Sequence, residues 1–211
     1  MALDQVEFGD VVFVDRQRDV RVIVNVPGRY SFAGRRNARG ERRVFTCRAV
    51  YLSPHEIALA APVNGKVGER VIADIEHLGK LEGPIARLLT RGFVMSIPAS
   101  KEKRGEFAAK IEWLEDYKNH DTPNRRDGER FAPAITYSNL IFADGSGEAC
   151  LVIDLSVSGA GISADTVPDI KTVLAVGSVV GRVVRHFVGG FAVQFFERQS
   201  RDTVEAMVSC E

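Results

Sequence analysis

Two blocks of this sequence recur about 100 residues further along the chain. CRAVYLSP (47–54) matches CLVIDLSV (150–157) at an offset of 103 residues, and GPIARLLTRGFVMSI (83–97) matches GRVVRHFVGGFAVQF (181–195) at an offset of 98. Two matches in the same order indicate tandem units of one fold, because a single match would carry little weight. A chain of 211 residues has room for two such units. The offset falls because one connection is shorter in the second unit.

Both units are predicted to consist of short antiparallel strands. Their β-branched and aromatic residues cluster in short segments with glycines at the ends. The expected strands are 46–52, 71–75, 85–89 and 92–97 in the first unit, and 149–155, 172–176, 181–185 and 191–196 in the second. Gly79 and Gly177 are expected at hairpin turns, where glycine adopts a positive φ without penalty. Short, closely spaced strands indicate an all-β fold of small antiparallel barrels rather than a doubly wound sheet.

Two helices are also predicted, one between the repeats and one after them, because apolar residues recur there at helical spacing. They are Phe107, Ile111 and Leu114 in the first helix, and Val204, Met207 and Val208 in the second. We therefore expect a first barrel over 1–99, a connecting helix and linker over 100–120, and a second barrel over 121–211.

Composition excludes several classes of protein. Hydrophobic residues make up 45% and charged residues 27% of the chain, which is typical of a globular protein and not of a disordered one. No apolar stretch approaches the roughly 18 residues that span a bilayer, so we expect no membrane partner. Acidic residues near the start replace the basic ones of a signal peptide, which indicates a cytoplasmic protein. Cys47, Cys150 and Cys210 are too widely spaced for a disulfide framework or a zinc cluster.

The net charge of zero conceals local concentrations of charge. Up to Lys118 the chain has 20 basic and 16 acidic residues, and beyond it 8 and 12. A charge imbalance of this size is too small for the protein to coat nucleic acid through its overall charge. We therefore do not expect nucleic acid as a partner. An anionic partner must therefore meet a local cluster. The two clusters are the stretch 29–48 and the run Arg125, Arg126 and Arg130.

Motifs of catalysis and metal binding are missing from the sequence. The histidines lack ligand spacing such as HExxH, and the cysteines lack CxxC. They are His55, His77, His120 and His186. SGAGISA contains the pattern GxGxxA, but Pro168 follows too soon for the long helix that a dinucleotide site requires. We therefore expect no enzyme, no cofactor and no metal ion.

The most informative pattern lies in the second unit. NRRDGERF supplies Arg126-x-x-x-Arg130, and 24 residues after Arg130 the segment VIDLSVSGAGIS supplies Asp154-x-Ser156-x-x-Gly159. The two motifs, in this order and around a strand, resemble RxxxR and (D/N)xSxxG of the PilZ domain. The resemblance covers essentially the whole chain, as two tandem PilZ-type units.

This resemblance implies two six-stranded antiparallel barrels and the bacterial second messenger cyclic di-GMP as ligand. The implied ligand-binding residues are Arg125, Arg126, Arg130, Asp154, Ser156 and Gly159. The arginines, on a loop before the barrel, would pair with phosphates and read guanine edges. The aspartate would accept from guanine N1 and N2, the serine would offer a hydroxyl, and the glycine would admit the ligand close to the backbone. Such an effector would change inter-domain or partner packing, and so regulate motility, exopolysaccharide or biofilm behaviour.

The first unit departs from this pattern. Tyr51, Ser53 and Glu56 stand at the positions aligned with the second motif. Tyr51 cannot supply a carboxylate, and Glu56 places a side chain and a negative charge where close approach is needed. The aligned loop, 15–21, has three arginines but none at RxxxR spacing. We therefore expect a degenerate unit that binds a protein partner, self-associates or signals.

The arginine-rich stretch 29–48 is expected to form a hairpin. It carries seven arginines against Glu41 alone: Arg29, Arg35, Arg36, Arg39, Arg42, Arg43 and Arg48. A solvated, charged hairpin is the simpler interpretation. The alternative is a surface for an anionic partner, nucleic acid backbone or an acidic protein, in a regulator that works independently of cyclic di-GMP. The salt dependence of nucleic-acid binding separates the two interpretations.

Overall fold

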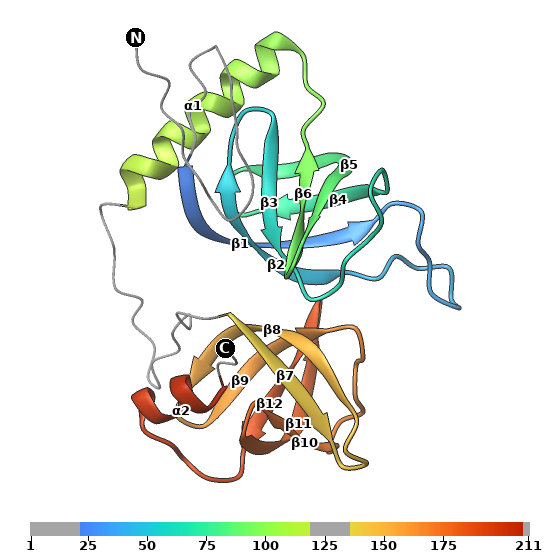
Figure 1. Ribbon diagram of the computed structural model, residues 1–211, viewed down its shortest axis with the longest axis vertical. Coiled ribbons are helices and arrows are strands. Elements are labelled where there is room, and N and C mark those ends of the chain that lie inside the picture. The colour runs from blue at the N-terminus through green and yellow to red at the C-terminus, as the bar shows by residue number, and fades with distance from the viewer. Residues whose placement is uncertain (1–21, 119–135, 209–211) are drawn as a thin grey trace.

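The computed structural model describes residues 22–118 and 136–208, which form two closed six-stranded barrels with antiparallel pairing throughout (Figure 1). The first barrel contains β1 (Val22–Phe32), β2 (Phe45–Leu52), β3 (Glu56–Ala60), β4 (Arg70–Ile75), β5 (Gly79–Leu89) and β6 (Gly92–Ser96). The second contains β7 (Tyr137–Phe142), β8 (Gly147–Ser156), β9 (Gly159–Ala164), β10 (Val173–Val176), β11 (Val179–Phe187) and β12 (Gly190–Phe195). The predicted tandem-barrel fold is confirmed.

The two barrels share one topology. The first follows the order β1-β2-β3-β6-β5-β4, and the second follows the equivalent order β7-β8-β9-β12-β11-β10. Interruptions of the strand register recur at the offsets of the sequence repeat. They lie between Ala49 and Tyr51, between Val152 and Asp154, between Ile85 and Arg87, and between Val183 and Arg185. A β-bulge kinks a strand at a fixed place, so its recurrence aligns the two barrels residue by residue.

All eight predicted strands form, and four more are present that the sequence did not predict. These are β1, β3, β7 and β9. Gly79 and Gly177 have φ of 78° and 60°, as expected for their turns. The GxGxxA pattern lies in β9, an antiparallel strand between β8 and β12, so it opens no helix.

One apolar core fills each barrel, and one helix covers each core. Phe107, Ile111 and Leu114 of α1 (Lys101–Lys118) are buried in the first core. Val204 and Val208 of α2 (Arg201–Val208) are buried in the second. Each fully buried aliphatic side chain contributes about 1.5–3 kcal/mol. Both predicted helices are confirmed, and each packs against its own barrel (Figure 1).

Equivalent positions in β2 and β8 carry buried cysteines. Cys47 and Cys150 are both fully buried and are not disulfide-bonded. Burial raises the pKa of the Cys47 thiol. These residues therefore act as small core side chains. Cys210 lies outside the described residues.

The barrels meet through a buried group of polar contacts around one carbonyl. The Gly189 carbonyl accepts from Ser163 Oγ at 2.6 Å, from Thr46 N at 3.2 Å and from Thr46 Oγ1 at 3.3 Å. Thr46 N also donates to Ser163 Oγ at 3.1 Å. Because Thr46 belongs to the first barrel and the other two to the second, this cluster joins the barrels by hydrogen bonds.

A tyrosine and an ion pair add further contacts between the barrels. The Tyr137 hydroxyl accepts from Ala61 N at 2.9 Å and donates to the Arg91 carbonyl. Burial raises the pKa of Tyr137 to about 12, so its hydroxyl keeps the proton that it donates. Arg43 pairs with Asp165 at 2.8 Å. These contacts between the barrels are polar.

Candidate functional site

The second motif lies where β8 turns into β9, on the outer face of the second barrel. Asp154 and Ser156 are in β8, and Gly159 opens β9 directly opposite Ser156. Arg125, Arg126 and Arg130 lie outside the described residues. Their part in the site therefore stays a prediction.

Asp154 belongs to a row of residues that crosses four adjacent strands. Asp154 in β8 is opposite Gly161 in β9, Gly161 is opposite Ala192 in β12, and Ala192 is opposite Arg185 in β11. Residues directly opposite one another in a sheet point to the same face. The neighbours Ala160, Ile162, Phe191 and Val193 lie in the core, so this row faces outward. An acid and an arginine thus border a floor of two small residues.

The floor is low because its middle residues have almost no side chains. A Cβ added to Gly161 would lie 3.0 Å from Asp154 Oδ1, so the carboxylate extends over this glycine. Adjacent strands are about 4.8 Å apart, so the three intervals from β8 to β11 measure about 14 Å along the sheet, which curves around half of the closed barrel. We call this surface the trough and define it as Asp154, Gly161, Ala192 and Arg185. Small residues therefore lie beside the Asp154 carboxylate, and Arg185 lies on the opposite side of the closed barrel.

Arg185 is exposed at the far end of the trough. Its guanidinium lies 5.9 Å from the centroid of the Phe187 ring. Within the described segments it makes no ion pair. A cation beside an aromatic ring can bind an incoming phosphate or base edge.

Ser156 and Gly159 have local structural roles. Ser156 Oγ donates to the Gly159 carbonyl at 3.2 Å and accepts from Ser158 N at 3.4 Å, which closes the turn. A Cβ on Gly159 would lie 2.5 Å from the Val193 carbonyl, so close strand packing requires glycine there. Ser53 of the first barrel closes the same turn by accepting from Glu56 N at 3.1 Å. The serine of this motif therefore shapes the turn in both barrels.

The equivalent row of the first barrel is occupied differently. It runs from Tyr51 through Ala58 and Val94 to Arg87. Arg87 pairs with Glu56 at 2.9 Å, and Glu56 stands where the second barrel has Gly159. The first barrel thus neutralises with its own carboxylate the arginine that the second barrel leaves exposed.

A first-barrel arginine lies at the edge of the trough. Arg48 is only 8% exposed, and its guanidinium donates to the side chain and, at 3.2 Å, to the backbone carbonyl of Asn25. Its Nη1 approaches the Ile153 carbonyl at 3.5 Å, inside the bulge that precedes Asp154. Burial lowers the pKa of Arg48. The trough therefore borders on the other barrel.

The trough faces away from the core of the second barrel, but Gly161 is buried and Ala192 is only 8% exposed. A cavity of about 290 Å³ between the barrels is lined by Ala61, Asn64, Arg91, Tyr137 and Asn139, among others, and by none of the trough residues. Among the described residues, no group of three His, Cys, Asp or Glu side chains could hold a metal ion. No described helix is long and apolar enough to cross a membrane.

The stretch 29–48 forms the predicted hairpin, between β1 and β2. The expectation that its arginines face Glu41 alone is wrong. Arg35 pairs with Glu69 at 2.7 Å and Arg43 pairs with Asp165 at 2.8 Å, so carboxylates distant in sequence neutralise both. Arg48 is buried at the barrel interface, as described above.

The chain is similar over most of its length to solved bacterial structures. They include PlzA of Borreliella burgdorferi in complex with c-di-GMP, at 12% identity, with 90% of this chain and 92% of that chain covered and a TM-score of 0.27. The Bacillus subtilis inhibitor of motility, MotI/DgrA, is similar at 10% identity, with coverage of 89% and 94% and a TM-score of 0.30. YcgR of Escherichia coli in complex with c-di-GMP is similar at 13% identity, with coverage of 87% and 80% and a TM-score of 0.25.

No family model matches the chain, and no curated protein matches its sequence. What the solved proteins bind is a property of those proteins.

Proposed function

We propose that the trough of the second barrel binds cyclic di-GMP and that the protein is a non-catalytic effector of this messenger. The observation that carries the proposal is the outward row from Asp154 over Gly161 and Ala192 to Arg185. Cyclic di-GMP combines two guanines with two phosphates, so its site needs an acceptor for guanine, a surface for the ring and cations. The row supplies all three.

The carboxylate of Asp154 gives this site a preference for guanine. Guanine presents hydrogen-bond donors at N1 and N2, and a carboxylate can accept hydrogen bonds from both. Adenine presents an acceptor at N1. Placing adenine there would leave the acid facing another acceptor, and an unsatisfied polar group costs about 1–3 kcal/mol. Arg185 would bind a phosphate or the O6 and N7 atoms of guanine. In the same proposal, Arg125, Arg126 and Arg130 supply further cations from the segment before β7.

Ligand binding in the trough would act on both barrels. Arg48 of the first barrel contacts the carbonyl of Ile153, which immediately precedes Asp154. A bound phosphate near this buried guanidinium would compensate its desolvation, and so favour one arrangement of the barrels. The effector would pass this change to a partner that controls motility, exopolysaccharide or biofilm.

Calorimetric titration of the full chain tests the proposal. Cyclic di-GMP should bind, whereas cyclic di-AMP and GTP should bind at least about 10-fold more weakly, a difference of about 1.4 kcal/mol. Asp154→Asn replaces the acceptor with an amide of the same shape and should weaken cyclic di-GMP binding by about 10-fold or more. Asp74→Asn, an exposed aspartate of the first barrel, is the matched control and should bind like the parent. Equal affinity for the two cyclic dinucleotides would refute the assigned role of Asp154.

The arginines before β7 are tested separately. Arg126→Ala or Arg130→Ala removes a charge-assisted contact worth about 1.5–3 kcal/mol, so affinity should fall by about 10-fold or more. The free energy of unfolding should stay within about 0.5 kcal/mol of the parent. If both variants bind with parental affinity, the trough remains the proposed site but these arginines do not belong to it.

A further inference from the structure

The loop between β1 and β2, residues 33–44, projects beyond both barrels (Figure 1). We call it the arginine loop. It carries Arg35, Arg36, Arg39, Arg42 and Arg43, with Glu41 as its only acid. The proposed cyclic di-GMP site does not use these residues. Their arrangement therefore requires its own explanation.

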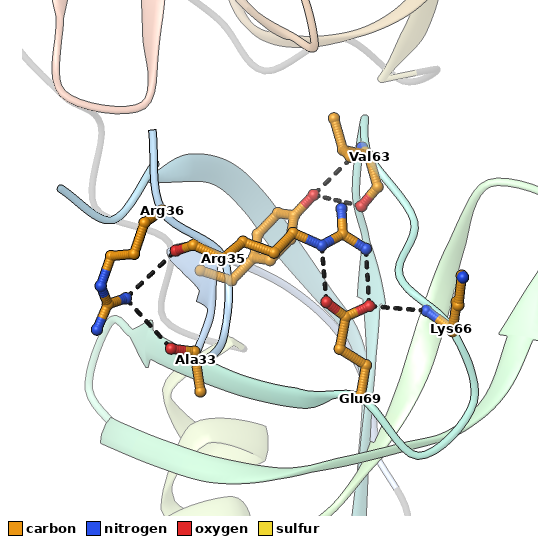
Figure 2. A network of polar contacts seen from close by, with 7 residues as sticks. Ala33, Arg35, Arg36, Val63, Lys66 and Glu69 are labelled. Atoms are coloured by element: carbon orange, nitrogen blue, oxygen red, sulfur yellow. Dashed lines mark hydrogen bonds and ion pairs between the residues drawn. The ribbon is translucent and has the colours of Figure 1, made fainter. Parts of the chain in front are cut away.

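Ion pairs fix the arginine loop at both ends. At its start, Arg35 donates through Nε and Nη2 to the two carboxylate oxygens of Glu69, each at 2.7 Å (Figure 2). Glu69 also accepts from Lys66 N at 3.0 Å, which fixes the carboxylate. At the loop's end, Arg43 donates to Asp165 at 2.8 Å and to the Ala164 carbonyl at 3.1 Å, both in the second barrel.

Between these two ion pairs, an asparagine orders the tip. Asn37 Oδ1 accepts from the backbone N of Arg39 and of Glu41, each at 2.9 Å. Asn37 Nδ2 donates to Glu41 Oε2 at 3.1 Å, and Gly40 has φ of 78°. Asparagine side chains stabilise turns in this way. The tip therefore has a defined conformation.

The remaining three arginines face solvent. Arg36 turns away from Glu69 and donates through Nη1 to the carbonyls of Ala33 and Arg35, each at 3.2 Å (Figure 2). Arg39 and Arg42 are exposed, and within the part of the chain that the structure describes none of the three makes an ion pair. An ordered loop thus presents three guanidinium groups that form no ion pair with the described residues, which lowers the entropy cost of binding an anion.

The chemistry of the tip favours phosphate over an acidic protein surface. Its other residues are small or polar: Gly34, Asn37, Ala38 and Gly40. Protein interfaces depend on buried aromatic or large apolar anchors, which the tip lacks. Contacts to a nucleic-acid backbone need only cations and close approach, which small residues permit. The zero net charge of the chain argues against bulk coating of nucleic acid and leaves a local contact of this size open.

We propose that Arg36, Arg39 and Arg42 bind the phosphodiester backbone of a nucleic acid. This site is separate from the trough and does not depend on the proposed binding of cyclic di-GMP. About three phosphate contacts give a slope of about −2.7 for log K against log salt on duplex DNA. The affinity should therefore fall about 40-fold between about 50 and 200 mM salt.

Fluorescence anisotropy of the full chain with labelled probes tests this proposal. The probes are a short DNA duplex of arbitrary sequence and a single-stranded RNA, which distinguish the two sources of phosphodiester. The triple variant Arg36→Ala/Arg39→Ala/Arg42→Ala should lose binding to the favoured probe at low salt. The control triple variant Lys80→Ala/Lys110→Ala/Arg198→Ala changes the net charge equally at exposed positions elsewhere, and should keep most of the binding.

Thermal unfolding establishes that both triple variants fold. Binding that the control variant loses to the same extent would show an effect of net charge and overturn the proposal. Binding of poly-glutamate by the parent, with none of DNA or RNA at low salt, would overturn it in favour of an acidic protein partner. Absence of binding to every probe would also overturn it.

Discussion

At the scale of single residues, equivalent arginines of the two barrels have different surroundings. Arg87 pairs with Glu56 at 2.9 Å, whereas Arg185 lies at the end of the trough without an ion pair among the described residues. The register places them identically, opposite Val94 and Ala192 respectively. One substitution, glutamate for glycine at the turn, accounts for the difference between an arginine that stabilises its own barrel and one available to a ligand.

These two arginines form a matched pair for mutation. Arg185→Ala should weaken cyclic di-GMP binding by about 10-fold, because a charge-assisted contact is lost, and should leave the free energy of unfolding nearly unchanged. Arg87→Ala should do the reverse, with stability lowered by on the order of 1 kcal/mol and affinity kept. Calorimetry and urea unfolding measure the two effects. The assignment of the trough fails if Arg87→Ala weakens binding as much as Arg185→Ala does.

Sequence could predict part of the site and not the rest, for a residue-level reason. The motif around Asp154 predicts an acid next to a turn, and the structure places it there. Arg185 lies 31 residues after Asp154 in the sequence. Only the register of three strand pairs places the two residues in the same row. The repeat already aligned Arg185 with Arg87, but an alignment does not say which residues share a row.

At the scale of elements, low strand propensity explains why β9 could not be predicted from the sequence. β9, GAGISA, consists mostly of small residues with low strand propensity. They are small because closed barrels bring backbones close together. A Cβ on Gly190, opposite β9, would lie only 2.1 Å from the Ile162 carbonyl. Tertiary packing requires these small residues, and this requirement cannot be read from the local sequence pattern.

The arginine loop gives a prediction about pH at this scale. Hydrogen bonding from Arg35 holds the pKa of Glu69 below its ordinary value. A lowered pKa in the folded protein means that the stabilisation is present above the ordinary pKa of glutamate, and is lost as the pH falls through the lowered one. The Arg35 Nε–H resonance should therefore shift in acid, in step with protonation of Glu69. In Glu69→Gln the resonance should show no such titration, and a shift that persists would assign the change to another group.

At the scale of the whole molecule, Gly189 accepts one group of the contacts between the barrels, those from Thr46. It has φ of 92°, and a Cβ there would lie 2.7 Å from Thr46 Oγ1. Gly189→Ala combines backbone strain with a clash across the interface, so it should separate the barrels. We expect a larger radius of gyration in small-angle scattering and faster hydrogen exchange at Thr46.

Gly145 provides the control for this substitution. Its φ is 82°, and an added Cβ meets nothing within 4 Å. Gly145→Ala should thus carry the backbone strain alone, and its scattering should match the parent. If Gly189→Ala also scatters like the parent, the contacts around Gly189 do not hold the barrels together.

The sharing of the Gly189 carbonyl also determines how the barrels can part. Three hydrogen bonds from two residues end on this one oxygen, and Ser163 takes part as donor and acceptor at once. If Thr46 moved away by a small distance, the buried donors would lose their acceptor before water could reach them. Half-open arrangements are therefore disfavoured. The barrels should therefore exchange between two discrete arrangements rather than drift apart gradually. A messenger bound beside this interface would then produce a switch-like response, with a threshold set by its concentration.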